Sequence, residues 1–218
     1  MAETSLPELP PGAFHKADPA PDAAFYAAPR FVAHIDDGAI AAVTALYRDA
    51  FPLGGPLGVT VLDLMSSWVS HLPEDEAYAE VIGVGMNARE LAANPRLDRW
   101  LVRDLNADPA LPLDDGSVDA VGLCVSIQYL QRPVEVLREV ERVLRPGGVL
   151  AVTFSNRCFP TKAVAIWQSL APAGQCALVA HYLQQAGLSA IEARDLSPSG
   201  RGDPLWAVIA RQEPAHAT

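Results

Sequence analysis

Residues 137–152 read LREVERVLRPGGVLAV and combine an amphipathic helical pattern, a break and a short apolar run. Leu137, Val140 and Leu144 recur at helical spacing, and glutamates and arginines occupy the other faces. Pro146 cannot continue a helix, and the two glycines after it let the backbone turn into a buried strand. A helix that leads through a turn into an apolar strand is half of a parallel α/β unit. The stretch therefore predicts an α/β protein.

Composition and charge narrow the possible partners. The chain has 218 residues, of which 50% are hydrophobic and 19% charged, as expected of one globular domain with a sizeable core. Its formal net charge of -10 argues against a nucleic acid or an anionic membrane as partner, because both attract positively charged surfaces. No run is long and apolar enough to span a membrane, and the start lacks the pattern of a secretory signal.

Three cysteines, Cys124, Cys158 and Cys176, are too few and too scattered for a disulfide framework or a Cys-x-x-Cys metal site. We therefore expect reduced thiols, a cytoplasmic location and no metal centre.

Apolar patterns and turn residues divide the chain into alternating strands and helices. The start is rich in proline and alanine and predicts a mobile arm over residues 1–22, followed by one domain over residues 23–218. Asp36 and Asp37 suit the N-terminus of a helix that runs to about Ala50, and Gly187 suits a helix C-cap. Strands are expected at residues 59–64, 81–84, 101–104, 118–125, 149–154, 190–193 and 205–210. A short helix through Glu90 and Leu91, a helix at 133–144 and a helical region over about 163–186 are expected between them.

Residues 111–121 read LPLDDGSVDAV. This segment resembles the turn and strand that, in class I S-adenosylmethionine (SAM) dependent methyltransferases, precede a helix ending in Arg-x-Leu-Arg-Pro-Gly-Gly. The two motifs have the order and spacing of that family here. The resemblance implies a Rossmann-like three-layer sandwich, with a seven-stranded, mostly parallel sheet and an antiparallel last strand. It also implies that SAM is the cofactor.

The loop after the first strand departs from the family pattern, which is an acidic residue followed by spaced glycines. Asp63 matches the acidic position, but Met65, Ser67 and Val69 stand where the glycines would be. Serine hydroxyls at positions 66 and 67 can hydrogen-bond the methionine part of the cofactor. The alternative is a loop that only caps the strand. The predicted contacts here are Asp63, Met65, Ser66 and Ser67.

The next three loops supply the other predicted cofactor contacts. Gly85 stands where the family has an acid that binds the ribose. Asn87 could bind the ribose in its place or only cap the following helix, and the two roles are compatible. Met86 offers an apolar face to the adenine. The resemblance assigns adenine contacts after the third strand and pocket-lining groups after the fourth. These residues are Asp104, Leu105, Val125, Ser126 and Tyr129.

Candidates for the acceptor side come from two other segments. Tyr26, Arg30 and His34 precede the first core helix, where the family builds its substrate lid, and His34 is the best general-base candidate. Arg157 and Lys162 follow the fifth strand and favour an anionic small molecule as acceptor. The alternative for each of these residues is surface salt bridging or loop packing.

Two other functions remain open. The missing glycines and the missing ribose acid would also suit a methyltransferase-like protein that binds or regulates without catalysis. A nicotinamide-dependent oxidoreductase would share the crevice, but the chain lacks Gly-x-Gly-x-x-Gly after the first strand.

Overall fold

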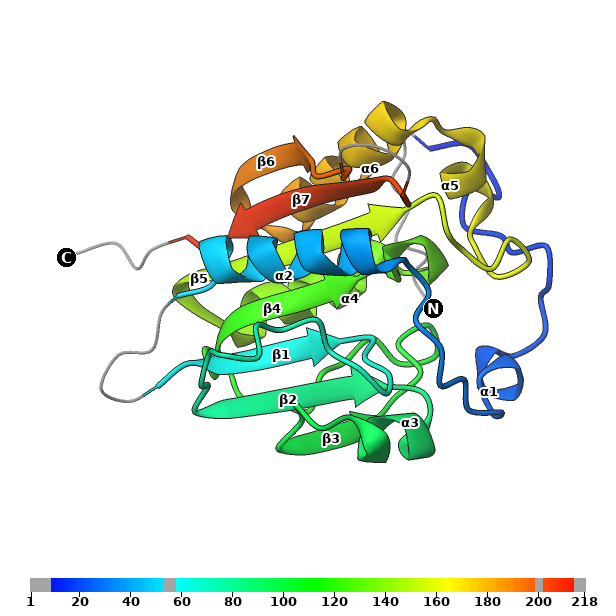
Figure 1. Ribbon diagram of the computed structural model, residues 1–218. Coiled ribbons are helices and arrows are strands. Elements are labelled where there is room, and N and C mark those ends of the chain that lie inside the picture. Colours follow the sequence, from blue (N-terminus) through cyan, green and yellow to red (C-terminus); the bar gives the residue numbers. More distant parts are fainter. Residues whose placement is uncertain (1–8, 53–57, 199–201, 214–218) are drawn as a thin grey trace.

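The computed structural model describes residues 9–52, 58–198 and 202–213 (Figure 1). The remaining residues, including 1–8 of the predicted arm and 214–218 of the predicted domain, lie outside the described residues. The elements are α1 (Asp22–Phe25), α2 (Asp37–Ala50), β1 (Thr60–Leu64), β2 (Glu80–Gly85), α3 (Ala88–Ala93), β3 (Arg99–Val102), β4 (Val118–Cys124), η1 (Ile127–Tyr129), α4 (Pro133–Val143), β5 (Leu144–Ser155), α5 (Ala165–Ser169), α6 (Pro172–Ala186), β6 (Ser189–Asp195) and β7 (Leu205–Arg211).

The strands form one seven-stranded sheet in the order β3-β2-β1-β4-β5-β7-β6. β1 to β5 pair in parallel, whereas β7 runs antiparallel to both of its neighbours, β5 and β6. Helix α2 covers one face of the sheet, and α4 and α6 cover the other (Figure 1). The predicted three-layer α/β fold with an antiparallel last strand is confirmed.

Helices α2 and α4 lie on opposite faces of the sheet. In α2, Asp36 is the N-cap and its carboxylate accepts a hydrogen bond of 2.9 Å from the N–H of Ala39. In α4, Pro133 lies in the first turn, and Leu137 and Val140 are fully buried against the sheet. Helix α4 ends at Val143, one residue before the predicted boundary.

The helical region predicted over about residues 163–186 is made of two helices, α5 and α6. Pro172 is the first residue of α6, and its ring excludes the preceding Ala171 from the helical conformation. The predicted third strand, 101–104, starts two residues too late, because β3 is an edge strand with exposed residues and lacks a buried face that would fix its register.

Strand β5 also differs from the prediction. It begins at Leu144 rather than at Val149, and a register irregularity opposite Val118 and Ala120 accommodates the Pro-Gly-Gly segment. Gly147 has φ +80°, so the backbone adopts a left-handed conformation there within the strand. Gly187 caps α6 with φ 96°, as predicted.

The N-terminal segment is in contact with the domain from residue 9 onward. Ala13 is buried, its carbonyl accepts the N–H of Ile166 at 2.9 Å, and Lys16 forms an isolated β-bridge with Val164. In Figure 1 this segment and α1 lie at the edge toward which β1, β2, β4 and β5 point. Residues 9–22 therefore pack on the domain, although the sequence predicted an arm apart from it.

Within the described ranges, no helix has the length and apolar character that crossing a membrane requires.

Candidate active site

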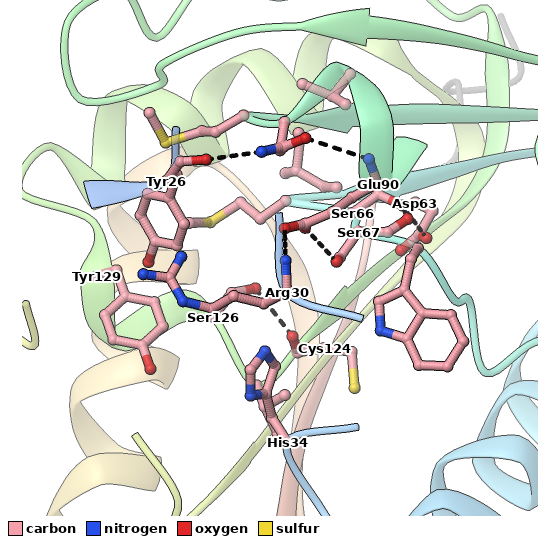
Figure 2. Close-up of a pocket in the computed structure, with 18 of the residues that line it drawn as sticks. Tyr26, Arg30, His34, Asp63, Ser66, Ser67, Glu90, Cys124, Ser126 and Tyr129 are labelled. Carbon is pink, nitrogen blue, oxygen red and sulfur yellow. Dashed lines mark hydrogen bonds between the residues drawn. The ribbon is translucent and has the colours of Figure 1, made fainter. Parts of the chain in front are cut away.

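A cavity of about 320 Å³ opens at the carboxyl ends of the parallel strands. Its walls come from the loops that follow β1 to β5 and from the segment between α1 and α2. Figure 2 shows Tyr26, Arg30 and His34 of that segment among the residues that line it. Crevices of this kind are where open parallel sheets bind their ligands. With the exception of Lys162, every site residue predicted from the sequence lines this one cavity; their individual roles stay predictions. The residues are Tyr26, Arg30, His34, Asp63, Met65, Ser66, Ser67, Gly85, Met86, Asn87, Asp104, Leu105, Val125, Ser126, Tyr129 and Arg157.

The loop after β1 keeps a left-handed backbone without glycine. Met65 has φ 58°, a conformation that costs a non-glycine residue about 1–2 kcal/mol. The next residue compensates, since the N–H of Ser66 donates to the carbonyl of Val84 at 2.7 Å. The backbone therefore adopts at Met65 the left-handed conformation that a glycine of the family pattern would adopt, and a methionine side chain stands at that position.

Asp63 is a buried carboxylate at the floor of the cavity. It accepts hydrogen bonds from the hydroxyl of Ser66, at 2.6 Å, and from that of Ser70. Burial raises the pKa of Asp63 to about 6, although both serines oppose this shift. Asp63 is thus a carboxylate that titrates close to neutral pH.

The end of β2 explains why the family's acidic residue is absent. A Cβ on Gly85 would lie 2.2 Å from the carbonyl oxygen of Ser66, so only glycine fits beside the β1 loop. Asn87 caps α3, because its side-chain oxygen accepts the N–H groups of Arg89 and Glu90. Its amide nitrogen donates to the carbonyls of Tyr26 and Ala27, so each polar atom of this side chain already has partners within the chain. The predicted capping role is confirmed.

In the loop after β3, Asp104 makes hydrogen bonds within its own turn. One oxygen of Asp104 accepts the N–H groups of Asn106 and Ala107, at 3.0 and 3.3 Å, and so shapes the turn. Leu105 is buried beside it. Asp104 also lines the cavity.

The loop after β4 is also strained. Val125 has φ 44°, and the hydroxyl of Ser126 donates to the carbonyl of Cys124 at 3.0 Å. The hydroxyl of Tyr129 accepts the N–H of Phe159 at 2.9 Å, which joins the loops after β4 and β5. Burial raises the pKa of Tyr129 to about 12, so it is a neutral phenol at physiological pH.

An aromatic cluster holds the segment between α1 and α2 over the cavity. The guanidinium of Arg30 stacks 4.4 Å from the ring centre of Phe25 and 5.4 Å from that of Phe159. The ring of His34 meets the same Phe159 edge-on at 5.3 Å. Burial lowers the pKa of His34, which keeps the imidazole neutral at pH 7 and able to accept a proton.

The two basic residues predicted after β5 have different surroundings. Arg157 lines the cavity, but its guanidinium pairs with Asp203 at 2.7 Å, so its charge is partly neutralised. Lys162 was predicted to face the acceptor, and this is wrong. Its side chain is fully buried, with Asp18 at 3.0 Å and Asp22 at 3.4 Å, because the N-terminal segment folds over it.

Sequence reasoning missed Glu90. This glutamate is 8% exposed, lines the cavity and accepts hydrogen bonds from the backbone N–H of Arg30 and the hydroxyl of Ser67, at 2.7 and 2.5 Å. A signal was present, because Asn87-x-x-Glu90 has the spacing of a capping box. Here the glutamate does not reach back to the cap, and it faces the cavity (Figure 2). Trp68 and Phe159 are further cavity residues without a sequence signal.

A family model described as a methyltransferase domain matches residues 65–152, from the end of β1 into β5. No curated protein matches the chain in sequence. Many solved structures share the fold. The [4+2]-cyclase SpnF is 20% identical with a TM-score of 0.56, over 79% of this chain and 81% of that one.

Two further structures of this kind are methyltransferases. A SAM-dependent methyltransferase from Aquifex aeolicus is 16% identical with a TM-score of 0.57, over 80% of this chain and 91% of that one. Phosphoethanolamine N-methyltransferase 2 from Haemonchus contortus, in complex with SAM, is 14% identical with a TM-score of 0.53, over 80% and 52%. The chain thus has the fold of the class I SAM-dependent methyltransferases, and the resemblance predicted from its sequence is confirmed.

Proposed function

We propose that this protein binds SAM in the cavity at the carboxyl edge of the sheet and transfers its methyl group to a small-molecule acceptor. The observation that carries the proposal is the convergence of all predicted cofactor residues, from four separate loops, on one cavity. The methyltransferase-domain match spans these four loops, and a methyltransferase of similar fold binds SAM.

The proposed division of labour follows the geometry. Asp63, the Ser66–Ser67 pair, the loop after β2 and the Asp104–Leu105 pair line the cavity, and we assign them to the cofactor. The segment between α1 and α2, residues 26–36, is called the covering segment. We assign to the acceptor three of its residues, Tyr26, Arg30 and His34, together with Arg157 from the loop after β5. The guanidinium of Arg30, which lies among aromatic rings, favours an anionic acceptor.

SAM supplies a methyl group already activated by a positively charged sulfur. The protein's contribution is then to orient the acceptor and to exclude water, which can lower a barrier by about 7–11 kcal/mol. An acceptor that carries a proton needs a base, and we assign this role to His34, whose pKa is lowered by burial. Tyr129 and Tyr26 are neutral phenols that can only hold or orient polar groups, because burial raises the pKa of both.

The first test is calorimetric titration of the purified protein with SAM and with S-adenosylhomocysteine. Micromolar affinity for either ligand is the expected result. Asp104→Ala should weaken both by about 1–3 kcal/mol if a buried hydrogen bond to the adenine is lost. Unchanged affinity in that variant would remove the assignment of the loop after β3.

A binding or regulatory protein without catalysis is the second candidate. The strained, glycine-free turns at Met65 and Val125 favour it, because bulky residues there narrow the space beside the backbone. A well-folded sample that binds neither SAM nor S-adenosylhomocysteine would support this candidate and exclude the first. For either function we propose a cytoplasmic location, on the basis of three unpaired cysteines.

A further inference from the structure

Glu90 is a buried carboxylate without a cationic partner. It is 8% exposed, and no ion pair joins it to a lysine, arginine or histidine side chain of the described residues. Burial of an unpaired carboxylate costs several kcal/mol unless hydrogen-bond donors replace water. A buried acid that faces a cavity is therefore expected to receive donors from whatever fills the cavity.

The donors within the chain use half of its capacity. One oxygen accepts the N–H of Arg30 at 2.7 Å and the other accepts the hydroxyl of Ser67 at 2.5 Å. An ionised carboxylate offers about four lone-pair sites, so about two remain. Figure 2 shows Glu90 between these two partners at the wall of the cavity. Each oxygen thus has one acceptor site left for a ligand.

The other acidic side chains of the cavity are used in different ways. Asp22 lies between buried lysines, of which Lys162 is 3.4 Å away, and Asp104 caps a turn. Asp63 takes the hydroxyls of two serines. Among the acids that line the cavity, only Glu90 stands on α3, the helix that directly follows β2.

The residues at the end of β2, Gly85 and Asn87, offer no free side-chain acceptor to a ligand. Gly85 has no room for a side chain, because a Cβ would meet the Ser66 carbonyl oxygen at 2.2 Å. The amide of Asn87 is bonded on both its oxygen and its nitrogen. The carboxylate that can accept a hydrogen bond from a ligand beside the end of β2 is therefore that of Glu90, on α3.

We propose that Glu90 binds the two ribose hydroxyls of the cofactor, one on each carboxylate oxygen. A vicinal diol presents two adjacent donors, which match the two acceptor sites left on Glu90, and nucleoside-binding α/β folds commonly hold ribose with one carboxylate. The inference rests on the proposed function, and it names a binding residue that neither the sequence pattern nor the fold assigns.

The same carboxylate joins the ribose site to the covering segment. Glu90 fixes the backbone of Arg30, and Arg30 lies between Tyr26 and His34 in the chain. A cofactor that completes the hydrogen bonds of Glu90 therefore also stabilises the segment that carries the acceptor side. Ribose binding and closure of the site depend on one side chain.

A thermodynamic cycle that combines one substitution in the protein with one change in the ligand tests the inference. S-adenosylhomocysteine and its 2′-deoxyadenosyl analogue are titrated by calorimetry into wild type and into Glu90→Gln, which keeps the size of the side chain. Wild type should prefer the ribose form by about tenfold or more, because a hydrogen bond to a charged group is lost in the deoxy form. Glu90→Gln should bind both forms with less than threefold difference. Glu74→Gln, an exposed acid outside the cavity, should keep the wild-type preference.

The results that would overturn the inference differ from the result that would overturn the proposed function. Equal affinity of wild type for the two ligands overturns the inference without any variant, even where Glu90→Gln fails to fold. A folded Glu90→Gln that keeps the tenfold preference also overturns it, and leaves Glu90 as a clamp for the covering segment. Binding of neither ligand by wild type removes the proposed function itself.

Discussion

The ammonium of Lys162 lies 3.4 Å from the carboxylate of Asp22, and both side chains are buried. This contact joins the loop after β5 to the N-terminal segment, and Asp22 is also part of the cavity wall. Lys16 pairs with the same carboxylate from within the segment. The cluster holds the segment against the domain at a point where it borders the cavity.

Removal of Lys162 should therefore destabilise the protein. Lys162→Ala leaves Asp22 buried with less compensating charge, and we expect the free energy of unfolding to fall by about 3–5 kcal/mol in urea titration. The double variant Lys162→Met/Asp22→Asn should lose less than the sum of the single variants, because it removes both charges. Arg48→Ala, which breaks an exposed pair with Asp75, is the matched control and should melt close to wild type. A Lys162→Ala protein as stable as wild type would contradict the role of the cluster.

Gly85→Ala should disrupt the loop after β1. The added Cβ meets a backbone carbonyl that cannot rotate away, so we expect a loss of about 1–3 kcal/mol of stability and at least tenfold weaker binding of S-adenosylhomocysteine. Gly116→Ala separates this clash from backbone strain. Gly116 has φ +57° and open space for a Cβ, so its substitution should cost about 1–2 kcal/mol and leave ligand affinity unchanged. Equal ligand affinity in the Gly85 variant and wild type would show that the β1 loop can move.

The pKa of Asp63 predicts a pH-dependent stability. Burial raises it to about 6, from about 3.9 in an unfolded chain. The folded protein therefore binds more protons between these values, and the contribution of Asp63 to stability falls as the pH rises through this window. Asp63→Asn removes the charge, so it should be more stable than wild type by about 1–3 kcal/mol at pH 8 and nearly equal at pH 4. Denaturant titrations at both pH values measure the difference, and a constant difference would show that Asp63 does not titrate there.

The sequence predicted the central strands well, because they are buried on both faces and leave little choice of structure. β1, β2 and β4 lie within two residues of their predicted ends. The edge strand β3 was misplaced because its residues are largely exposed, so no continuous apolar pattern marks its limits. The helical region over about residues 163–186 was predicted as a whole, and its division into α5 and α6 falls just before Pro172, the first residue of α6.

Site residues were predictable where strand ends alone determine their place. Asp63 and Asp104 follow strands, and the topology brings such loops to one edge of the sheet. The places of Lys162 and Glu90 depend on how the N-terminal segment folds back: Lys162 meets Asp18 and Asp22 from that segment, and Glu90 meets the backbone of Arg30. Contacts between segments so far apart in the sequence leave no periodic pattern. The charge of Lys162 and the capping-box spacing of Glu90 were visible in the sequence, but neither indicated these contacts.

The titration of His34 depends on its burial and on Glu90, its neighbour in the cavity. Burial lowers the pKa of His34 below the ordinary value of 6.5, while the negative charge of Glu90 opposes this shift. Titration of the imidazole followed by NMR, with the signal assigned by its loss in His34→Gln, should give a midpoint below 6.5. Glu90→Gln removes the opposing charge and should lower the midpoint further, whereas Glu74→Gln should leave it in place. The protein would then hold a neutral base at pH 7, and the rate of methyl transfer to a proton-bearing acceptor should fall only as the pH drops below 6.5. A midpoint at or above 6.5 would mean that Glu90 outweighs burial, and His34 would then be partly cationic at neutral pH and better suited to bind an anion than to accept a proton.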